Sequence, residues 1–159
     1  MSREDLRKRT AIRVQAIVHR DGRVLMAKHQ EGGQDYWCLP GGALEEGETP
    51  EEGALRELLE EACVEGRIIR QTGCALDVHG RNDTYTYLVD IGDQEPSLGH
   101  DPEVGADDIL LVDIQWLALR EIPERDRAFL WRAGLLSIPD FFEEVAGWGG
   151  EVSYPGSSG

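Results

Sequence analysis

Basic residues are scarce in this chain of 159 residues. Lysine and arginine together number 16, against 31 aspartate and glutamate residues, which gives a formal net charge of −15. A charge of this sign and size repels the phosphate backbone of DNA and RNA at long range, so we expect no nucleic acid polymer as a partner. A small phosphorylated substrate is compatible with it, because bound divalent cations locally reverse the charge of an acidic pocket.

Cysteines and long apolar runs are also few. Cys38, Cys63 and Cys74 are odd in number and lack CxxC spacing, which argues against a disulfide framework and a structural zinc site. The first nine residues are charged and lack the apolar stretch of a signal peptide, and no apolar run approaches the length of a membrane span. We therefore expect a cytoplasmic protein with no membrane partner.

The chain has the length and composition of a single domain. Its residues are 40% hydrophobic and 30% charged, which allows one hydrophobic core and leaves little room for a second. The segment from Gly147 to Gly159 is rich in glycine and serine. The predicted organisation is one domain over residues 1–146, followed by a flexible tail over residues 147–159.

The predicted strands and helices alternate along the chain. A hairpin is expected over residues 12–28, because apolar and polar residues alternate there and Asp21-Gly22 supplies a turn. Residues 30–35 form a glycine-rich polar loop in this interpretation. The remaining elements, apart from one helix discussed next, are a strand at 36–39 that ends at Pro40-Gly41-Gly42, strands at 67–70, 75–79 and 84–91, a long acidic loop at 92–108, a strand at 109–116, and helices at 124–136 and 140–146.

A helix that runs to about Ala62 has the clearest start signal in the chain. Thr49 is its expected N-cap, with proline at the first helical position and a glutamate three residues after the threonine. Gly53 lies inside this helix, where glycine costs about 1 kcal/mol relative to alanine. We attribute Gly53 to close packing of the helix on the sheet.

Three glutamates share one face of this helix. At 100° per residue, Glu60 and Glu61 lie within about 60° of Glu57, whereas leucines such as Leu58 and Leu59 lie on the apolar side. We therefore expect the glutamates to point away from the core. Their repulsion is weakly compensated within the helix, and hard divalent cations would relieve it. Two interpretations follow: a solvated acidic face, or a magnesium site that receives a phosphorylated ligand.

Residues 42–64 closely resemble the box of the Nudix hydrolases, the MutT-like family. That box is glycine, five residues, glutamate, seven residues, Arg-Glu, an aliphatic residue, any residue, Glu-Glu, any residue, glycine and an aliphatic residue. Every defined position matches except Cys63. The segments around Arg13-Val14, Trp37 to Gly42 and Ile114 to Trp116 extend the likeness. The resemblance implies an α/β fold, the Nudix α/β/α sandwich with a mixed β-sheet flanked by helices.

The resemblance also implies a metal site. Glu57, Glu60 and Glu61 would bind Mg²⁺, with Mn²⁺ as an alternative ion. Glu48 would support the metal through water. Gly42 would contribute its backbone carbonyl or a close approach.

The catalytic residues implied by the resemblance are Arg56, Glu57, Glu60 and Glu103. Arg56 would orient the glutamates. Family members take the general base either from the box helix or from a later acidic loop, so Glu57 and Glu103 are both candidates for that role.

Cys63 departs from the family pattern at the end of the helix. A left-handed backbone conformation is cheap only for glycine, so cysteine predicts about 1 kcal/mol of strain or a slightly longer helix that ends near Gly66. We expect a shifted turn with activity retained.

The expected activity is that of a pyrophosphatase, the Mg²⁺-dependent hydrolysis of the diphosphate linkage between a nucleoside diphosphate and another moiety. Nucleoside triphosphates, nucleotide sugars and dinucleoside polyphosphates all stay open as substrates. One alternative is a nucleotide-sensing domain without catalysis. Another is an RNA-end pyrophosphohydrolase, which would need a basic groove. The four histidines lack the spacing of a metal-binding motif, and no aromatic residue is assigned to the substrate. A homodimer is a further hypothesis.

Overall fold

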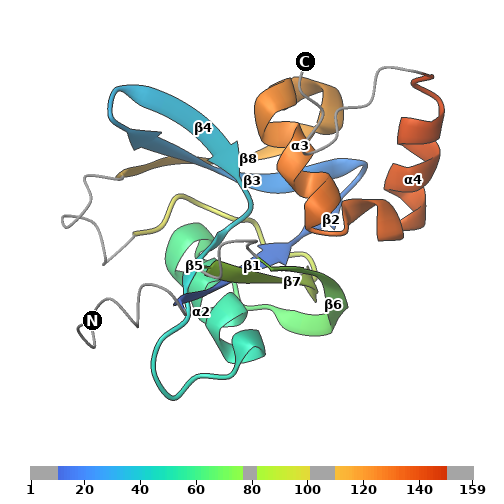
Figure 1. Cartoon of the computed structure of the whole chain (residues 1–159). Coiled ribbons are helices and arrows are strands. Elements are labelled where there is room, and N and C mark those ends of the chain that lie inside the picture. Colours follow the sequence, from blue (N-terminus) through green and yellow to red (C-terminus); the bar gives the residue numbers. More distant parts are fainter. Residues whose placement is uncertain (1–10, 77–81, 101–109, 150–159) are drawn as a thin grey trace.

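The strands of this protein divide between two sheets (Figure 1). The structure is a computed structural model that describes residues 11–76, 82–100 and 110–149. The strands are β1 (Ala11–Ile17), β2 (His19–Arg20), β3 (Arg23–Glu31), β4 (Gln34–Cys38), β5 (Gly41–Ala43), β6 (Arg67–Leu76), β7 (Asn82–Asp90) and β8 (Leu110–Ala118). The helices in the described residues are α2 (Pro50–Ala62), α3 (Glu124–Arg132) and α4 (Pro139–Ala146), with 3-10 turns at Leu119–Glu121 and Leu135–Ser137.

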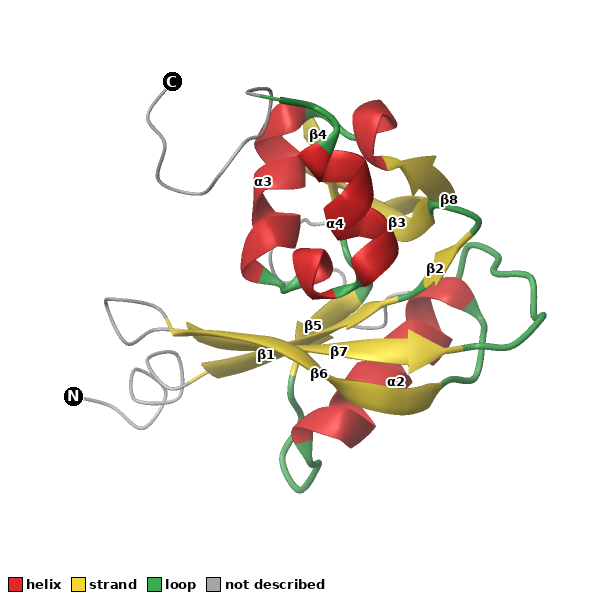
Figure 2. Ribbon diagram, turned by 90° about the vertical axis from the view of Figure 1, so that its right-hand side faces the viewer, coloured by secondary structure: helices red, strands yellow, loops and turns green. Residues whose placement is uncertain are grey.

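One sheet has the strand order β5-β1-β7-β6 and is mixed, because β1 runs parallel to β7 and antiparallel to β5. In the other sheet, β3 pairs antiparallel with β2, β4 and β8. Figure 2 shows α2 on one side of the mixed sheet and α3 and α4 on the other. This arrangement confirms the α/β/α sandwich, with the added feature that the strands form two sheets.

Two hairpins shape the second sheet, and each turns on two residues with positive φ. Asp21 (φ 53°) and Gly22 (φ 77°) join β2 to β3, which confirms the predicted turn, whereas residues 12–17 of the predicted hairpin belong to β1 of the mixed sheet. Gly32 (φ 58°) and Gly33 (φ 80°) join β3 to β4. Such pairs are typical of tight two-residue hairpin turns. The polar loop expected over residues 30–35 is therefore wrong, since strand pairing continues up to the two glycines.

Three other elements differ from the prediction. The short strand β5 was expected to be loop, and it forms because its backbone pairs with β1. The strand expected at 67–70 and the start of the one expected at 75–79 belong to a single strand, β6, whose register on β7 shifts twice, while residues 77–79 lie outside the described residues. The helix expected at 124–136 ends at Arg132, because Gly134 (φ 90°) turns the chain into a 3-10 segment.

The hydrophobic core has two parts, one on each side of the mixed sheet. Leu58 of α2 belongs to the part that also contains Val14 and Tyr87. Phe141 of α4 belongs to the part that contains Ile17 and Leu88. Neighbouring residues of β7 therefore pack in opposite directions, as expected for a sheet that is covered on both faces.

Two further sequence predictions bear on the whole chain. No helix within residues 11–76, 82–100 and 110–149 is long and apolar enough to cross a membrane. The single domain over residues 1–146 stays a prediction, and residues 150–159 of the expected tail lie outside the described residues.

Candidate functional site

The start of α2 is fixed by its cap, as the sequence predicted. The hydroxyl of Thr49 accepts a hydrogen bond from the Glu52 backbone N–H (3.2 Å) and donates one to the Glu52 carboxylate (3.0 Å). Gly53 supplies close contact further along the helix, since a Cβ there would lie 2.7 Å from Leu44 Cδ1 and 3.2 Å from Val14 Cγ2. Cap and contact together set which residues α2 turns toward the sheet.

The orientation of α2 corrects one expectation from the sequence. Glu57 and Glu61 are only 3% and 1% exposed, whereas Leu59 is 47% exposed. The three glutamates were expected to face away from the core, which was wrong for Glu57 and Glu61. Leu59 was expected to face the sheet, which was also wrong. The helix lies against β1 and β5 with a buried stripe that contains Ala54 and Leu58 as well as the two acids. Hydrophobic periodicity misplaces this stripe because it treats every glutamate as solvent-facing.

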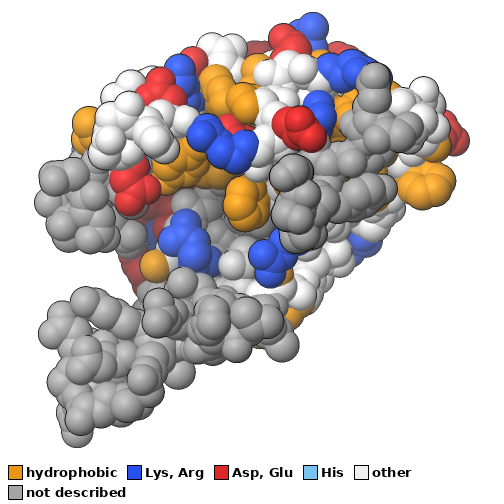
Figure 3. All heavy atoms as spheres, turned by 45° about the horizontal axis from the view of Figure 1, so that its top comes forward, with side chains coloured by type: hydrophobic (Ala, Val, Ile, Leu, Met, Phe, Trp, Pro, Cys, Tyr) orange, Lys and Arg blue, Asp and Glu red, His pale blue; other side chains and the backbone are white. Residues whose placement is uncertain are grey.

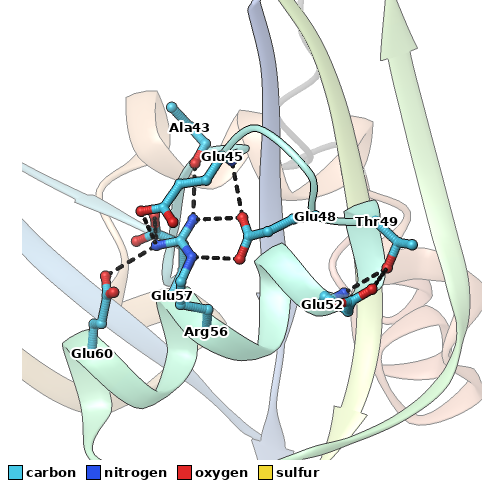
Figure 4. A network of polar contacts seen from close by, with 8 residues as sticks. All are labelled: Ala43, Glu45, Glu48, Thr49, Glu52, Arg56, Glu57 and Glu60. Carbon is cyan, nitrogen blue, oxygen red and sulfur yellow. Dashed lines mark hydrogen bonds and ion pairs between the residues drawn. The ribbon is translucent and has the colours of Figure 1, made fainter.

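Arg56 stands at the centre of the acidic residues (Figure 4). Its guanidinium donates two hydrogen bonds to Glu48, at 2.7 and 3.1 Å. One nitrogen, Nη1, also bonds Glu57 (3.0 Å) and Glu60 (3.2 Å), and Nη2 bonds the Ala43 carbonyl oxygen (3.0 Å). Arg56 therefore orients three glutamates and ties them to the end of β5. The bond to Arg56 lowers the pKa of Glu48.

Glu57 is the most perturbed acid of the site. Burial raises its pKa to about 7, and the negative charge of Glu61 adds to this effect, while Arg56 opposes it. Gly42 leaves room for this carboxylate, because a Cβ on Gly42 would lie within 2.6 to 2.9 Å of the Glu57 carboxylate atoms. The close approach that the sequence suggested for Gly42 is thus made to Glu57.

Glu61 is held from the opposite side. The backbone N–H of Gly41 donates to Glu61 Oε1 (2.8 Å). The other oxygen, Oε2, has no hydrogen-bond partner and lies 3.4 Å from His29 Nε2 in an ion pair. Burial would lower the pKa of His29, but the close contacts and charges of Cys38 and Glu61 outweigh it and raise that pKa to about 10.

A short segment after β7 packs on the last turn of α2, and we call residues 97–100 the helix strap. Backbone N–H groups of Ser97, Gly99 and His100 donate to the carbonyl oxygens of Ala62, Glu61 and Glu60, at 3.0, 2.8 and 2.7 Å. These carbonyl groups have no partner within a helix, so the strap serves as a C-terminal cap. The strap leads into residues 101–109, and Glu103 lies outside the described residues.

The helix end also settles the question raised by Cys63. Cys63 adopts the left-handed conformation (φ 59°, ψ 33°), and its N–H donates to the Leu59 carbonyl oxygen (3.0 Å). The helix ends at Ala62, where the family glycine would end it. The prediction of a shifted turn is therefore wrong. Cys63 adopts the left-handed conformation despite the strain that this costs a residue other than glycine.

The glutamates of the site have the ligand atoms that a divalent ion prefers, although in this structure several of their carboxylates are bonded to Arg56. Carboxylate oxygens are the ligands that Mg²⁺ prefers. Glu61 Oε2 is a buried acceptor without a hydrogen bond, and Gly42 keeps the space beside Glu57 free of a side chain. Within the described residues, no three His, Cys, Asp or Glu side chains already surround a point where a metal could sit. Metal binding would therefore require the carboxylates around Arg56 to turn.

The acidic residues of α2 lie beside the glycine-rich strand β5 on an α/β/α sandwich, an arrangement whose carboxylates suit a divalent metal and a phosphorylated ligand. The family model described as NUDIX domain matches residues 7–136. The chain belongs to the Nudix hydrolase family.

Relatives share only part of their length with this chain. A nucleoside triphosphate pyrophosphatase/Nudix hydrolase fusion protein of Bifidobacterium longum is 37% identical over 95 residues, which are 60% of this chain and 18% of that protein. An RNA pyrophosphohydrolase of Actinobacillus succinogenes is 44% identical over 54 residues, 34% of this chain and 26% of that protein. The chain thus spans well under half of either curated relative.

Solved structures share the fold over most of the chain. A NUDIX hydrolase from Nitrosomonas europaea has a TM-score of 0.64 and 22% identity, covering 91% of this chain and 76% of that one. The ORF135 protein of E. coli has a TM-score of 0.61 and 20% identity, covering 89% of this chain and 94% of that one. At this level of identity the likeness shows the fold alone.

The structure brings together all the predicted site residues that it describes. It also adds three that the sequence did not assign: His29, Tyr36 and Cys38. The rings of His29 and Tyr36 are stacked, with centroids 5.7 Å apart, and Cys38 Sγ lies 3.3 Å from His29 Nδ1. Reading the glycine pair as a two-residue turn would have placed His29 opposite Tyr36.

Proposed function

We propose that this protein catalyses the Mg²⁺-dependent hydrolysis of the diphosphate linkage in a nucleoside diphosphate joined to another moiety. The observation that carries the proposal is the grouping of Glu48, Glu57 and Glu60 around Arg56, with the buried Glu61 held beside them by the Gly41 backbone N–H. Two of these acids are buried, where like charges repel strongly. A divalent cation shared with substrate phosphates would relieve that repulsion.

The glutamates have distinct tasks in this proposal. Glu57, Glu60 and Glu61 hold the metal, and Glu48 supports it through water while keeping Arg56 in place. The metal, when bound, neutralises phosphoryl oxygens and acidifies a water molecule. Backbone N–H groups at the glycine-rich strand end lie beside the same acids, as the bond from Gly41 to Glu61 illustrates.

In this proposal a carboxylate near the attacking water takes a proton from it. Burial raises the pKa of Glu57 to about 7 in the metal-free protein, and a bound metal would favour the ionised form that accepts a proton. Glu57, on the box helix, is the candidate base among the described residues. Glu103 remains the alternative base that the family pattern suggests.

The substrate class is small nucleotides, with nucleoside triphosphates, nucleotide sugars and dinucleoside polyphosphates as members to be tested. The relative from Actinobacillus succinogenes is named an RNA pyrophosphohydrolase, which keeps a capped or triphosphorylated RNA end in the test panel. The net charge of −15 disfavours an RNA substrate, because it repels the phosphate backbone. On the face seen in Figure 3, the Lys and Arg side chains are separated by acidic and hydrophobic ones.

A substrate panel tests the proposal. The protein is incubated with Mg²⁺ and diphosphate compounds, including a 5′-triphosphorylated RNA oligonucleotide, and released phosphate is measured after phosphatase treatment. Glu60→Gln and Glu61→Gln should each lose at least about 100-fold in rate, because each removes a carboxylate that would hold the metal, and the metal would stabilise charge in the transition state. Glu46→Gln, at an exposed position, is the matched control that should keep the wild-type rate.

The outcomes separate the alternatives. If both Gln variants hydrolysed substrate at the wild-type rate, the assignment of catalysis to these glutamates would be refuted. Nucleotide binding without turnover of any compound would favour the sensing domain instead. The cytoplasmic location and the homodimer stay predictions, which fractionation and light scattering would test.

A further inference from the structure

Glu61 sits deeper than any other acid of the candidate metal site, and its two oxygens are held differently. Oε1 receives a hydrogen bond from the backbone of Gly41, which fixes one side of the carboxylate. Oε2 is buried without a hydrogen bond, and His29 Nε2 lies 3.4 Å from it. The direction in which Oε2 points therefore depends on where the His29 ring is held.

The ring of His29 is itself fixed from two sides. His29 lies on β3, opposite Tyr36 of β4, and the two rings are stacked at 18° to each other. On the same strand as Tyr36, Cys38 places its sulfur 3.3 Å from His29 Nδ1. A chain of contacts thus runs from Cys38 through both nitrogens of the imidazole to Glu61.

A purely structural explanation accounts poorly for this chain of contacts. His29 is 6% exposed and Glu61 1% exposed, and burying two polar side chains is costly unless they are closely paired. The preceding residues of β3, Val24 to Ala27, are all buried and apolar, so this strand accepts apolar side chains readily. Replacing such a buried pair by apolar residues is often neutral or stabilising, which suggests a role beyond stability.

We propose that His29, supported by Cys38, is a positioning residue that holds the Glu61 carboxylate ready for a divalent cation. The inference rests on the proposed function, because it assigns Glu61 to the metal. Groups that contact a metal-ligating side chain fix its orientation, and their removal typically weakens metal binding by about 10- to 100-fold. Neither His29 nor Cys38 touches the substrate in this arrangement.

The test measures binding of Mn²⁺ alone, by electron paramagnetic resonance, to the full-length protein without nucleotide. His29→Phe keeps the ring stack on Tyr36 and removes both nitrogens, so the Kd for Mn²⁺ should rise by at least about 10-fold. His19→Phe is the matched control. His19 also contacts an aromatic ring, with its centroid 5.5 Å from that of Phe141, and it has no carboxylate partner in the described residues.

Cys38 provides a second, milder pair of variants. Cys38→Ser retains a group that hydrogen-bonds His29 Nδ1 and should bind Mn²⁺ nearly as well as wild type, whereas Cys38→Ala should bind it several-fold more weakly. Circular dichroism and thermal melting check that each variant is folded. The rescue by serine distinguishes positioning from packing, because serine and alanine both leave the space of the sulfur partly empty.

Each outcome decides the proposal. A folded His29→Phe protein with wild-type Mn²⁺ affinity, or Cys38→Ala and Cys38→Ser proteins with equal affinities, would overturn it. Loss of thermal stability without loss of Mn²⁺ affinity would also overturn it. Failure of the proposed function would look different: the wild-type protein would hydrolyse no compound of the panel, while the effect of His29 on Mn²⁺ binding would still be measurable.

Discussion

Glu57→Gln is expected to make the metal-free protein more stable while it abolishes activity. Glutamine has nearly the shape of glutamate and keeps an oxygen that accepts the bond from Arg56 Nη1, which is 3.0 Å long. What the substitution removes is a buried negative charge. The same charge is the one that we propose to bind the metal.

The size of the effect follows from the pKa of Glu57. Burial and the Glu61 charge raise that pKa from 4.5 to about 7, so ionising the folded protein costs about 3 kcal/mol more than ionising the unfolded chain. A carboxyl group whose pKa is raised on folding stabilises the fold below its unfolded pKa, and this contribution is lost as the pH rises through the folded pKa. The free energy of unfolding of the metal-free wild type should therefore fall between about pH 4.5 and pH 8.

Urea denaturation in EDTA at a series of pH values measures this effect. Near pH 5 the wild type and Glu57→Gln should differ little, and at about pH 8 the variant should be more stable by up to about 3 kcal/mol. The pKa of His29 is also raised, from 6.5 to about 10, so the stability that His29 contributes declines as the pH rises from about 6.5 to 10. This decline should be similar in both proteins and cancel in the comparison. Glu46→Gln should show no such gain. A wild type that is as stable as the variant at pH 8 would refute the reasoning.

Three further predictions concern glycine positions around α2. Gly42→Ala should reduce kcat/KM by at least about 10-fold, since the new Cβ would lie within 2.9 Å of the Glu57 carboxylate and displace it; wild-type kinetics would contradict this. Cys63→Gly should raise the free energy of unfolding by up to about 1 kcal/mol in urea, because φ is 59° there; a less stable variant would count against the assigned strain. Gly99→Ala should detach the helix strap, since its Cβ would overlap the Glu60 carbonyl oxygen, and amide hydrogen exchange at residues 97–100 should become faster.

The sequence predicted the parts of the site that depend on local chemistry. The cap at Thr49 and the end of α2 near Ala62 follow from residue preferences within one turn of the helix. The box pattern likewise placed Glu48 and Arg56 eight residues apart, and the structure joins them by two hydrogen bonds. These contacts are short in sequence, so local rules suffice for them.

Contacts between distant strands were not predictable in the same way. The pairing of β5 with β1 and the burial of Glu61 against His29 join residues about 30 positions apart. Such contacts depend on strand register, and register was lost when Gly32-Gly33 was interpreted as part of a loop. The prediction that the glutamates face solvent failed for a related reason, because periodicity locates an apolar stripe and says nothing of acids buried for function.

The acids of the site carry more negative charge than the neighbouring cations offset. Glu45, Glu48, Glu57, Glu60 and Glu61 carry five negative charges when all are ionised, and Arg56 and protonated His29 offset two. The remaining three negative charges favour the binding of a divalent cation. In the metal-free protein a proton on Glu57 removes one of them, because its pKa is about 7. Metal binding at neutral pH should then release part of a proton, and titration calorimetry in buffers of different ionisation enthalpy would detect that release.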